Sequence, residues 1–134
     1  MCLTTTKYCF RYAKQDIVCY KLLFYSSIYD VYRTPYRMAA IPNNVLSGEQ
    51  TFKAEGRGRT RCWSNNEKEI YGGYIHVFKT LEDAKSCCGN SDDIFECIIP
   101  KGTRYAKGTF DCRNSYAAKE IRFVKKVNKY LMKS

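Results

Sequence analysis

Arginine side chains stand beside aromatic residues in three short segments, and this pairing is typical of sites that bind phosphorylated ligands with rings. The segments are GRGRTRCW, KGTRYAKG and VYRTPYR. A guanidinium group can make two parallel hydrogen bonds to one phosphate, and an aromatic ring can stack on a base. The expected phosphate-binding residues are Arg33, Arg37, Arg57, Arg59, Arg61, Arg104 and Lys107. The expected base-stacking residues are Trp63, Tyr74 and Tyr105.

The overall charge favours the same kind of ligand. The chain has 134 residues, with 23 Lys and Arg against 13 Asp and Glu, which gives a net charge of +10. A folded domain with this charge attracts nucleotides, nucleic acids and acidic proteins. Each segment alone is better explained as a solvated loop with one buried aromatic residue. Three such segments on one basic chain favour an anionic ligand that carries rings.

Residues for catalysis are few. His76 is the single histidine, and the chain has neither a G-x-S-x-G motif nor the G-K-[ST] ending of a P-loop. The neighbouring acids Glu82 and Asp83 precede a helical pattern, where they stabilise the helix dipole. A Cys–His pair stays open as an alternative, because such partners meet in space and not in sequence. The sequence does not indicate an enzyme.

Eight cysteines raise the question of disulfides and metals. No C-x2-C pair occurs, and His76 has no second histidine with which to bind zinc. Cys19 and Cys97 lie in apolar runs, where cysteine behaves as a small buried hydrophobic residue. We expect eight reduced thiols, no metal and no cofactor. Zinc is the minority alternative, with weak support from the adjacent pair Cys87 and Cys88.

The pattern of apolar residues predicts the elements that position these side chains. Strands are expected at 16–25, 51–64, 74–79, 93–100, 103–107 and 118–127, the second of them as a hairpin with arginines at its tip. A short helix is expected at 80–90, because Thr80 is a good N-cap and a glycine follows the pattern. Residues 26–35 are expected to be a loop or edge segment, 36–50 irregular with one helical turn, and 65–70 a polar connection.

These elements predict a single α+β domain over residues 1–134. Its mostly antiparallel sheet should carry one or two short helices packed on it. No run of ~20 apolar residues and no secretory signal occurs, so we expect a cytoplasmic protein without a membrane partner.

The layout MCLTT…DIVCYKLL…TPYR…GGYIHVFKTLEDA…CIIPKGTRYAKG…YAAKEIRF resembles small proteins encoded by tailed bacteriophages. Within it, GGYIHVFKTLEDAKSCC followed by FECIIPKGT is similar to a segment of ADP-ribosyltransferase-type folds. Those enzymes need an Arg or His on the first strand, a Ser or Tyr on a middle strand and a late Glu. Here the first strand offers Lys21 and no Arg or His, and only Tyr74 and Glu120 could take the other two places, so a shared fold would imply lost chemistry.

The resemblance to phage proteins implies an anti-defence role in the cytoplasm of the host bacterium. Such proteins sequester cyclic oligonucleotide or cyclic ADP-ribose signals without turnover, often as homo-oligomers. Two alternatives remain: an inhibitor that binds an acidic host protein, and a degenerate ADP-ribosyltransferase-like enzyme. Non-specific binding of nucleic acid is compatible with the charge but not favoured, because the expected helix is too acidic to recognise DNA.

Overall fold

A computed structural model of the chain describes residues 3–6, 10–34, 40–54, 56, 59–62, 67–89, 92–110 and 113–127. Its longest strand, β3 (Ile17–Ser26), shows how the sheet is built. Cys19, Lys21 and Leu23 are buried on one face, whereas the residues between them are less buried. This alternation follows from the two-residue repeat of an extended chain. The strand predicted at 16–25 is therefore confirmed.

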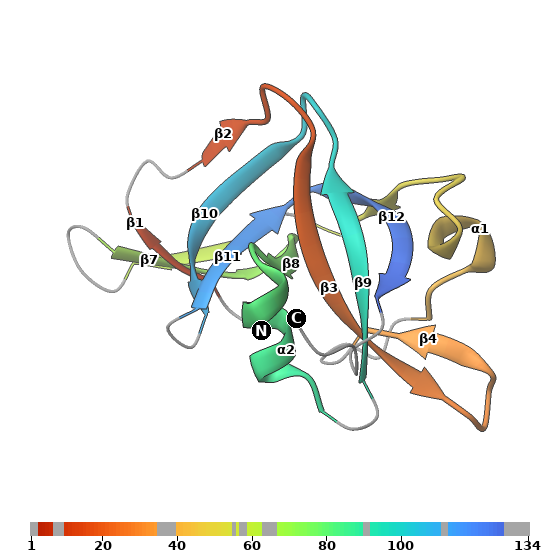
Figure 1. The fold of residues 1–134 in the computed structure, drawn as a ribbon. Coiled ribbons are helices and arrows are strands. Elements are labelled where there is room, and N and C mark those ends of the chain that lie inside the picture. The colour runs from red at the N-terminus through yellow and green to blue at the C-terminus, as the bar shows by residue number, and fades with distance from the viewer. Residues whose placement is uncertain are drawn as a thin grey trace.

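The described residues form twelve strands in one antiparallel sheet, with two short helices (Figure 1). The remaining strands are β1 (Leu3–Thr6), β2 (Phe10–Tyr12), β4 (Val31–Arg33), β5 (Phe52–Lys53), β6 (Arg59–Cys62), β7 (Glu67–Gly72), β8 (Ile75–Phe78), β9 (Asp92–Ile99), β10 (Arg104–Phe110), β11 (Arg113–Ala118) and β12 (Glu120–Val127). The helices are α1 (Asn43–Leu46) and α2 (Leu81–Cys87). The order across the sheet is β5-β12-β9-β3-β8-β11-β10-β1-β7-β6, with β2 paired to β10 and β4 to β3.

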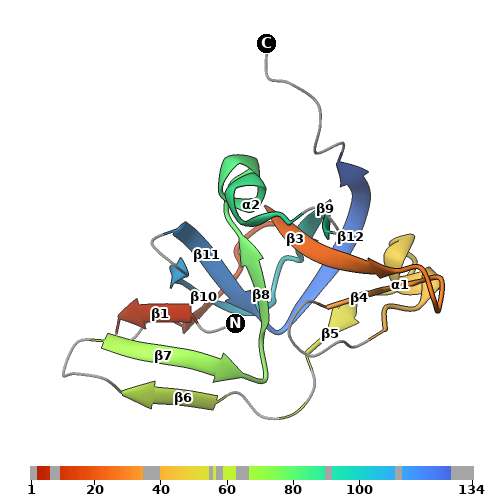
Figure 2. The same ribbon diagram turned by 90° about the horizontal axis from the view of Figure 1, so that it is seen from below.

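The sheet bends on itself, and the main core lies inside the bend (Figure 2). Strands β3, β9 and β12 contribute Leu23, Phe95 and Phe123 to this core. Strands β8 and β11 contribute Val77 and Tyr116 to the same cluster from the other half of the sheet. A single residue separates β11 from β12, so the chain passes directly from one half to the other.

Helix α2 covers part of the outer face. The backbone N–H of Asp83 donates to Thr80 Oγ1 over 3.2 Å, as expected of an N-cap. Ala84 packs against Phe78 and Ile94 in a second apolar cluster beneath the helix. The predicted helix is thus confirmed, although it ends at Cys87. Among the described residues, no helix has the length and apolar character that crossing a bilayer requires.

Two sequence predictions are wrong. Residues 51–64 do not form a hairpin, because β5 pairs with β12 whereas β6 pairs with β7, at opposite ends of the sheet. Residues 65–70 are not merely a connection, since β7 begins at Glu67. The local pattern of both segments is compatible with strands, but the choice of partner depends on residues far away in the sequence.

The predicted architecture is otherwise found in the described part of the chain. It is mostly antiparallel sheet, with two short helices packed against it. The helices are so short that a mostly-β description fits as well as the predicted α+β class.

Candidate anion-binding site

The structure separates the predicted site residues into several places. Arg37, Arg57 and Trp63 lie outside the described residues. Arg59 and Arg61 belong to β6, where only the backbone is described. The side chains of the other five predicted residues are described and can be placed.

Three of those five do not meet at one site. Tyr105 is buried in the main core, with its ring edge-on to Tyr116 at 5.8 Å, so it does not offer a face for stacking. Lys107 is exposed, but it stands three residues from Arg104 and therefore points to the opposite face of β10. Arg33 lies on β4 with its guanidinium 5.2 Å from the centre of the Tyr29 ring.

The other two predicted residues, Tyr74 and Arg104, belong to one group of cations and rings. The guanidinium of Arg104 lies 4.6 Å from the centre of the Phe10 ring. Phe10 and Tyr74 are stacked, with centroids 5.3 Å apart and planes at 29°. Lys119 Nζ lies 4.4 Å from the centre of the Tyr74 ring. We call Phe10, Tyr74, Arg104 and Lys119 the cation–aromatic cluster.

Strand pairing brings this cluster together. Ala106 of β10 lies opposite Phe10 on one side and Ala117 of β11 on the other. Both alanines are fully buried, and Phe10 and Tyr74 pack against them. Because alanine has a small side chain, the rings can lie close to the sheet. The backbone N–H of Lys119 donates to the carbonyl of Arg104 over 3.0 Å, so the backbones of these two residues lie side by side.

A glycine turn places Tyr74. Gly73 has a φ of 71°, a left-handed conformation that glycine adopts without steric cost. Its carbonyl accepts a hydrogen bond from Lys119 Nζ over 2.8 Å. The turn thus holds both the ring and the ammonium group that lies over it. The sequence reasoning did not predict Phe10 and Lys119 as site residues. Within KGTRYAKG it predicted Arg104, which is their neighbour in the cluster.

The described backbone of β6 begins near the same region. In the pairing of β6 with β7, Arg59 lies opposite Gly72, two residues before Tyr74. One predicted cationic residue therefore stands at the start of a strand whose partner leads into the cluster.

The cluster has the properties of an anion-binding surface. Arg104 is exposed, whereas Phe10, Tyr74 and Lys119 are half-buried. A guanidinium that lies over a ring uses its face for that contact, so its N–H groups remain directed outward from its edge. Each of these cations can bind a phosphate group, and the rings beside them can contact a base.

A second chemically notable group lies in the main core. Lys21 Nζ donates to the carbonyl of His76 over 3.0 Å, and burial lowers the pKa of this amine to about 8. Cys19 and Cys97 are paired residues of neighbouring strands. Burial raises the pKa of Cys19 to about 12 and also raises the pKa of Cys97. Both stay thiols at neutral pH, and a thiol is a poor nucleophile.

The residues that the ADP-ribosyltransferase resemblance suggested make separate contacts. Lys21 binds the backbone of β8, and Tyr74 belongs to the cation–aromatic cluster. Glu120 accepts a hydrogen bond from Thr51 Oγ1 over 2.8 Å. Within the described ranges, no group of three His, Cys, Asp or Glu side chains is arranged to hold a metal ion.

No protein-family model matches the chain, and neither a curated protein nor a solved structure was found to be similar to it. A function must therefore be inferred from the chemistry of the cluster itself.

Proposed function

We propose that this protein binds and sequesters an anionic, nucleotide-type ligand without chemical turnover. The observation that carries the proposal is the cation–aromatic cluster, in which Arg104 and Lys119 are held against the stacked rings of Phe10 and Tyr74. Cations and aromatic surfaces in one place are what a phosphorylated, ring-bearing ligand needs.

In this proposal the two cations share the phosphate groups. Arg104 offers a planar fork that suits bidentate hydrogen bonds, whereas Lys119 acts as a point charge already oriented by its bond to the carbonyl of Gly73. Because both groups are fixed by protein contacts, little side-chain entropy is lost on binding. The base would contact the edges of the Phe10 and Tyr74 rings, because their faces are in contact with each other and with the two cations.

The resemblance to phage proteins suggests which ligand to test. Cyclic oligonucleotides and cyclic ADP-ribose carry both phosphates and rings, so they fit the proposed chemistry. The biological role would then be removal of an immune signal in the cytoplasm of an infected bacterium. Tight binding without turnover is supported by the separate contacts of Lys21, Tyr74 and Glu120, which do not form the catalytic set of a transferase.

A thermal-shift screen tests the proposal. The panel contains cyclic dinucleotides, cyclic trinucleotides, cyclic ADP-ribose isomers, NAD and ADP-ribose. A ligand at ~100 times its Kd stabilises the folded state by about 2.7 kcal/mol, which raises Tm by several degrees. Recovery of the unchanged compound would support sequestration, whereas recovery of a cleaved product would make the protein an enzyme.

Two variants locate the site. Arg104→Gln and Lys119→Gln should each weaken binding by at least tenfold, because each removes a charged partner of the phosphate. Lys107→Gln is the matched control, since it removes the same charge from the opposite face of β10. Equal loss in all three variants would indicate binding by overall charge and not by the cluster. If no compound binds, the proposal is wrong, and inhibition of an acidic host protein becomes the preferred function.

A further inference from the structure

A hairpin with an apolar tip projects from the sheet. Strands β3 and β4 are joined by a turn at residues 27–30, and this hairpin extends away from the main body in Figure 1. Ile28 is 86% exposed, Tyr29 67% and Tyr25 39%. Single apolar residues on a surface are ordinary, but these three belong to one short hairpin. We call Tyr25, Ile28 and Tyr29 the hairpin knob.

Tyr25 of the knob is held by side-chain contacts. Asp30 has a φ of 52°, and its carboxylate accepts a hydrogen bond from the Tyr25 hydroxyl. The Tyr25 and Tyr32 rings are 5.2 Å apart, and Tyr32 contacts the core residue Phe95 edge-on at 5.1 Å. The Tyr32 hydroxyl also donates to Asp93 over 2.8 Å. Because the Tyr25 ring is already fixed, it loses little entropy when a partner covers it.

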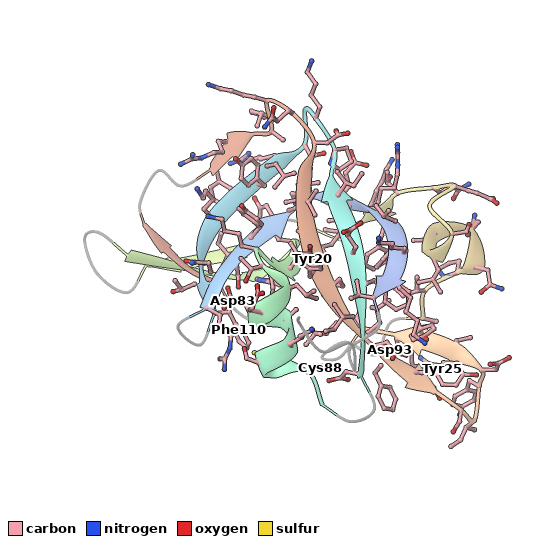
Figure 3. All side chains as sticks on the ribbon, viewed as in Figure 1. Tyr20, Tyr25, Asp83, Cys88, Asp93 and Phe110 are labelled. Atoms are coloured by element: carbon pink, nitrogen blue, oxygen red, sulfur yellow. The ribbon has the colours of Figure 1, made fainter. Side chains whose placement is uncertain are left out.

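An open groove lies on the outer face of the sheet, near the other end of the same strand. It has a volume of about 450 Å³ and is lined by Val18, Tyr20, Lys79, Thr80, Leu81 and Glu82. Figure 3 shows Tyr20 beside the upper end of α2, where this groove lies. Val18 is 53% exposed, which is high for a valine in a central strand. We call this feature the β3–α2 groove.

We propose that the hairpin knob of one copy occupies the β3–α2 groove of a second copy. Side chains of Ile28 and Tyr29 would cover the apolar surface of Val18 and Leu81. The hairpin carries Asp30 and Arg33, and the groove is lined by Lys79 and Glu82, so each surface offers one charge of either sign to the other. A volume of 450 Å³ is also within the range that binding pockets of ligand size have.

The contact would be head-to-tail. Knob and groove are different surfaces on one chain, so each copy has one of each to offer, and the assembly grows into a ring or an open filament. The hairpin alone covers less than the ~800 Å² per partner of a standard interface, so micromolar affinity is expected. The net charge of +10 repels a second copy, and association should therefore strengthen when salt screens the charge.

Sedimentation velocity over a range of protein and salt concentrations tests this proposal. The wild type should form species larger than a monomer, more of them at higher salt. Ile28→Asp and Val18→Asp should each be monomeric at concentrations at least tenfold higher. Val124→Asp is the matched control, because Val124 is 46% exposed but belongs to neither surface.

A mixture of the two variants separates this arrangement from all others. Ile28→Asp keeps an intact groove and Val18→Asp an intact knob, so the mixture should form a heterodimer and nothing larger. Loss of association in Ile28→Asp alone, with Val18→Asp behaving as wild type, would indicate knob-to-knob contact and overturn the proposal. A wild type that stays monomeric at all concentrations, or a mixture that stays monomeric, would overturn it as well. Circular dichroism checks that both variants are folded.

Discussion

Lys21 is the most unusual residue of the main core. Its ammonium group is buried between the two halves of the sheet and donates to the carbonyl of His76 in β8. Strands β3 and β8 share only the register pair Tyr20 and Phe78, so the ladder between them is short. The side chain of Lys21 adds a hydrogen bond between these two strands next to that pair. This explains why a charge is tolerated in an apolar core.

The pKa of Lys21 predicts how stability depends on pH. Its folded value of about 8 lies below the ordinary value of 10.5. Between these values the unfolded chain binds more protons than the folded protein, so this group makes stability rise with pH over that window. Below pH 8 the Lys21 amine is protonated in both the folded and the unfolded state, so the cost of burying its charge does not change with pH.

Lys21→Met should remove this dependence. The free energy of unfolding of the wild type, relative to the variant, should rise by a few kcal/mol between pH 8 and pH 10.5. Denaturant unfolding at several pH values measures the difference. Cys19 and Cys97 act in the opposite direction, since their raised pKa values destabilise the fold above pH 9. Both cysteines are present in the wild type and in the variant, so their effect on the free energy of unfolding cancels to first order in the difference. A difference that does not change with pH would contradict the prediction.

The sequence predicted half of the cation–aromatic cluster. Arg104 was found because it stands in the basic and aromatic segment KGTRYAKG, and Tyr74 because it stands in GGYIHVFK, the segment similar to ADP-ribosyltransferase-type folds. Phe10 and Lys119 could not be found in this way, because the register of β10 with β2 and β11 brings them in. Tyr105 was misjudged for a related reason. It neighbours Arg104, but alternation along β10 directs its side chain into the core.

At the scale of elements, the docking of α1 against β12 depends on one glycine. Gly48 follows the helix with a φ of 85°, and a Cβ at this position would lie 2.6 Å from the carbonyl oxygen of Phe123. Real Cβ atoms do not approach a backbone oxygen so closely. Either the segment after α1 or strand β12 would have to move.

Gly48→Ala should therefore destabilise the protein strongly. The left-handed conformation costs an L-residue about 1 kcal/mol, and the clash should add roughly 1–3 kcal/mol. Gly102→Ala is the matched control, because Gly102 has a φ of 88° but no atom within 4 Å of its added Cβ. Thermal unfolding compares the two variants. Equal losses of stability would show that conformation alone, and not the contact with Phe123, explains the effect.

Elements with local signals could be predicted, and elements that depend on distant partners could not. Helix α2 has its N-cap, its acidic first turn and its stop within ten residues. The central strands have runs of apolar residues, and such runs indicate buried strands without reference to the rest of the chain. In contrast, β6 and β7 are polar strands at one end of the sheet, and their neighbours along the chain do not show that they pair with each other.

At the scale of the whole molecule, the bent sheet isolates the core from solvent. Cys19 and Cys97 are fully buried, and burial is the main cause of their raised pKa values. We predict that a maleimide at pH 7.5 will label them only as fast as the protein unfolds. Mass spectrometry of peptides after timed labelling measures each site. Cys87 is only partly buried and is the internal comparison. Labelling of Cys19 at the rate of a free thiol would contradict this.

The order of strands across the sheet has a consequence for synthesis on the ribosome. β3 is paired along its length with β9, which begins at Asp92, and β1 is paired with β10, which begins at Arg104. At ~5–20 residues per second, the apolar face of β3 waits for several seconds before its partner has been translated. The N-terminal strands therefore cannot form the core before the later strands have been synthesised. Completion of the core is postponed until β9 to β12 have been translated, and chaperones have that interval in which to bind.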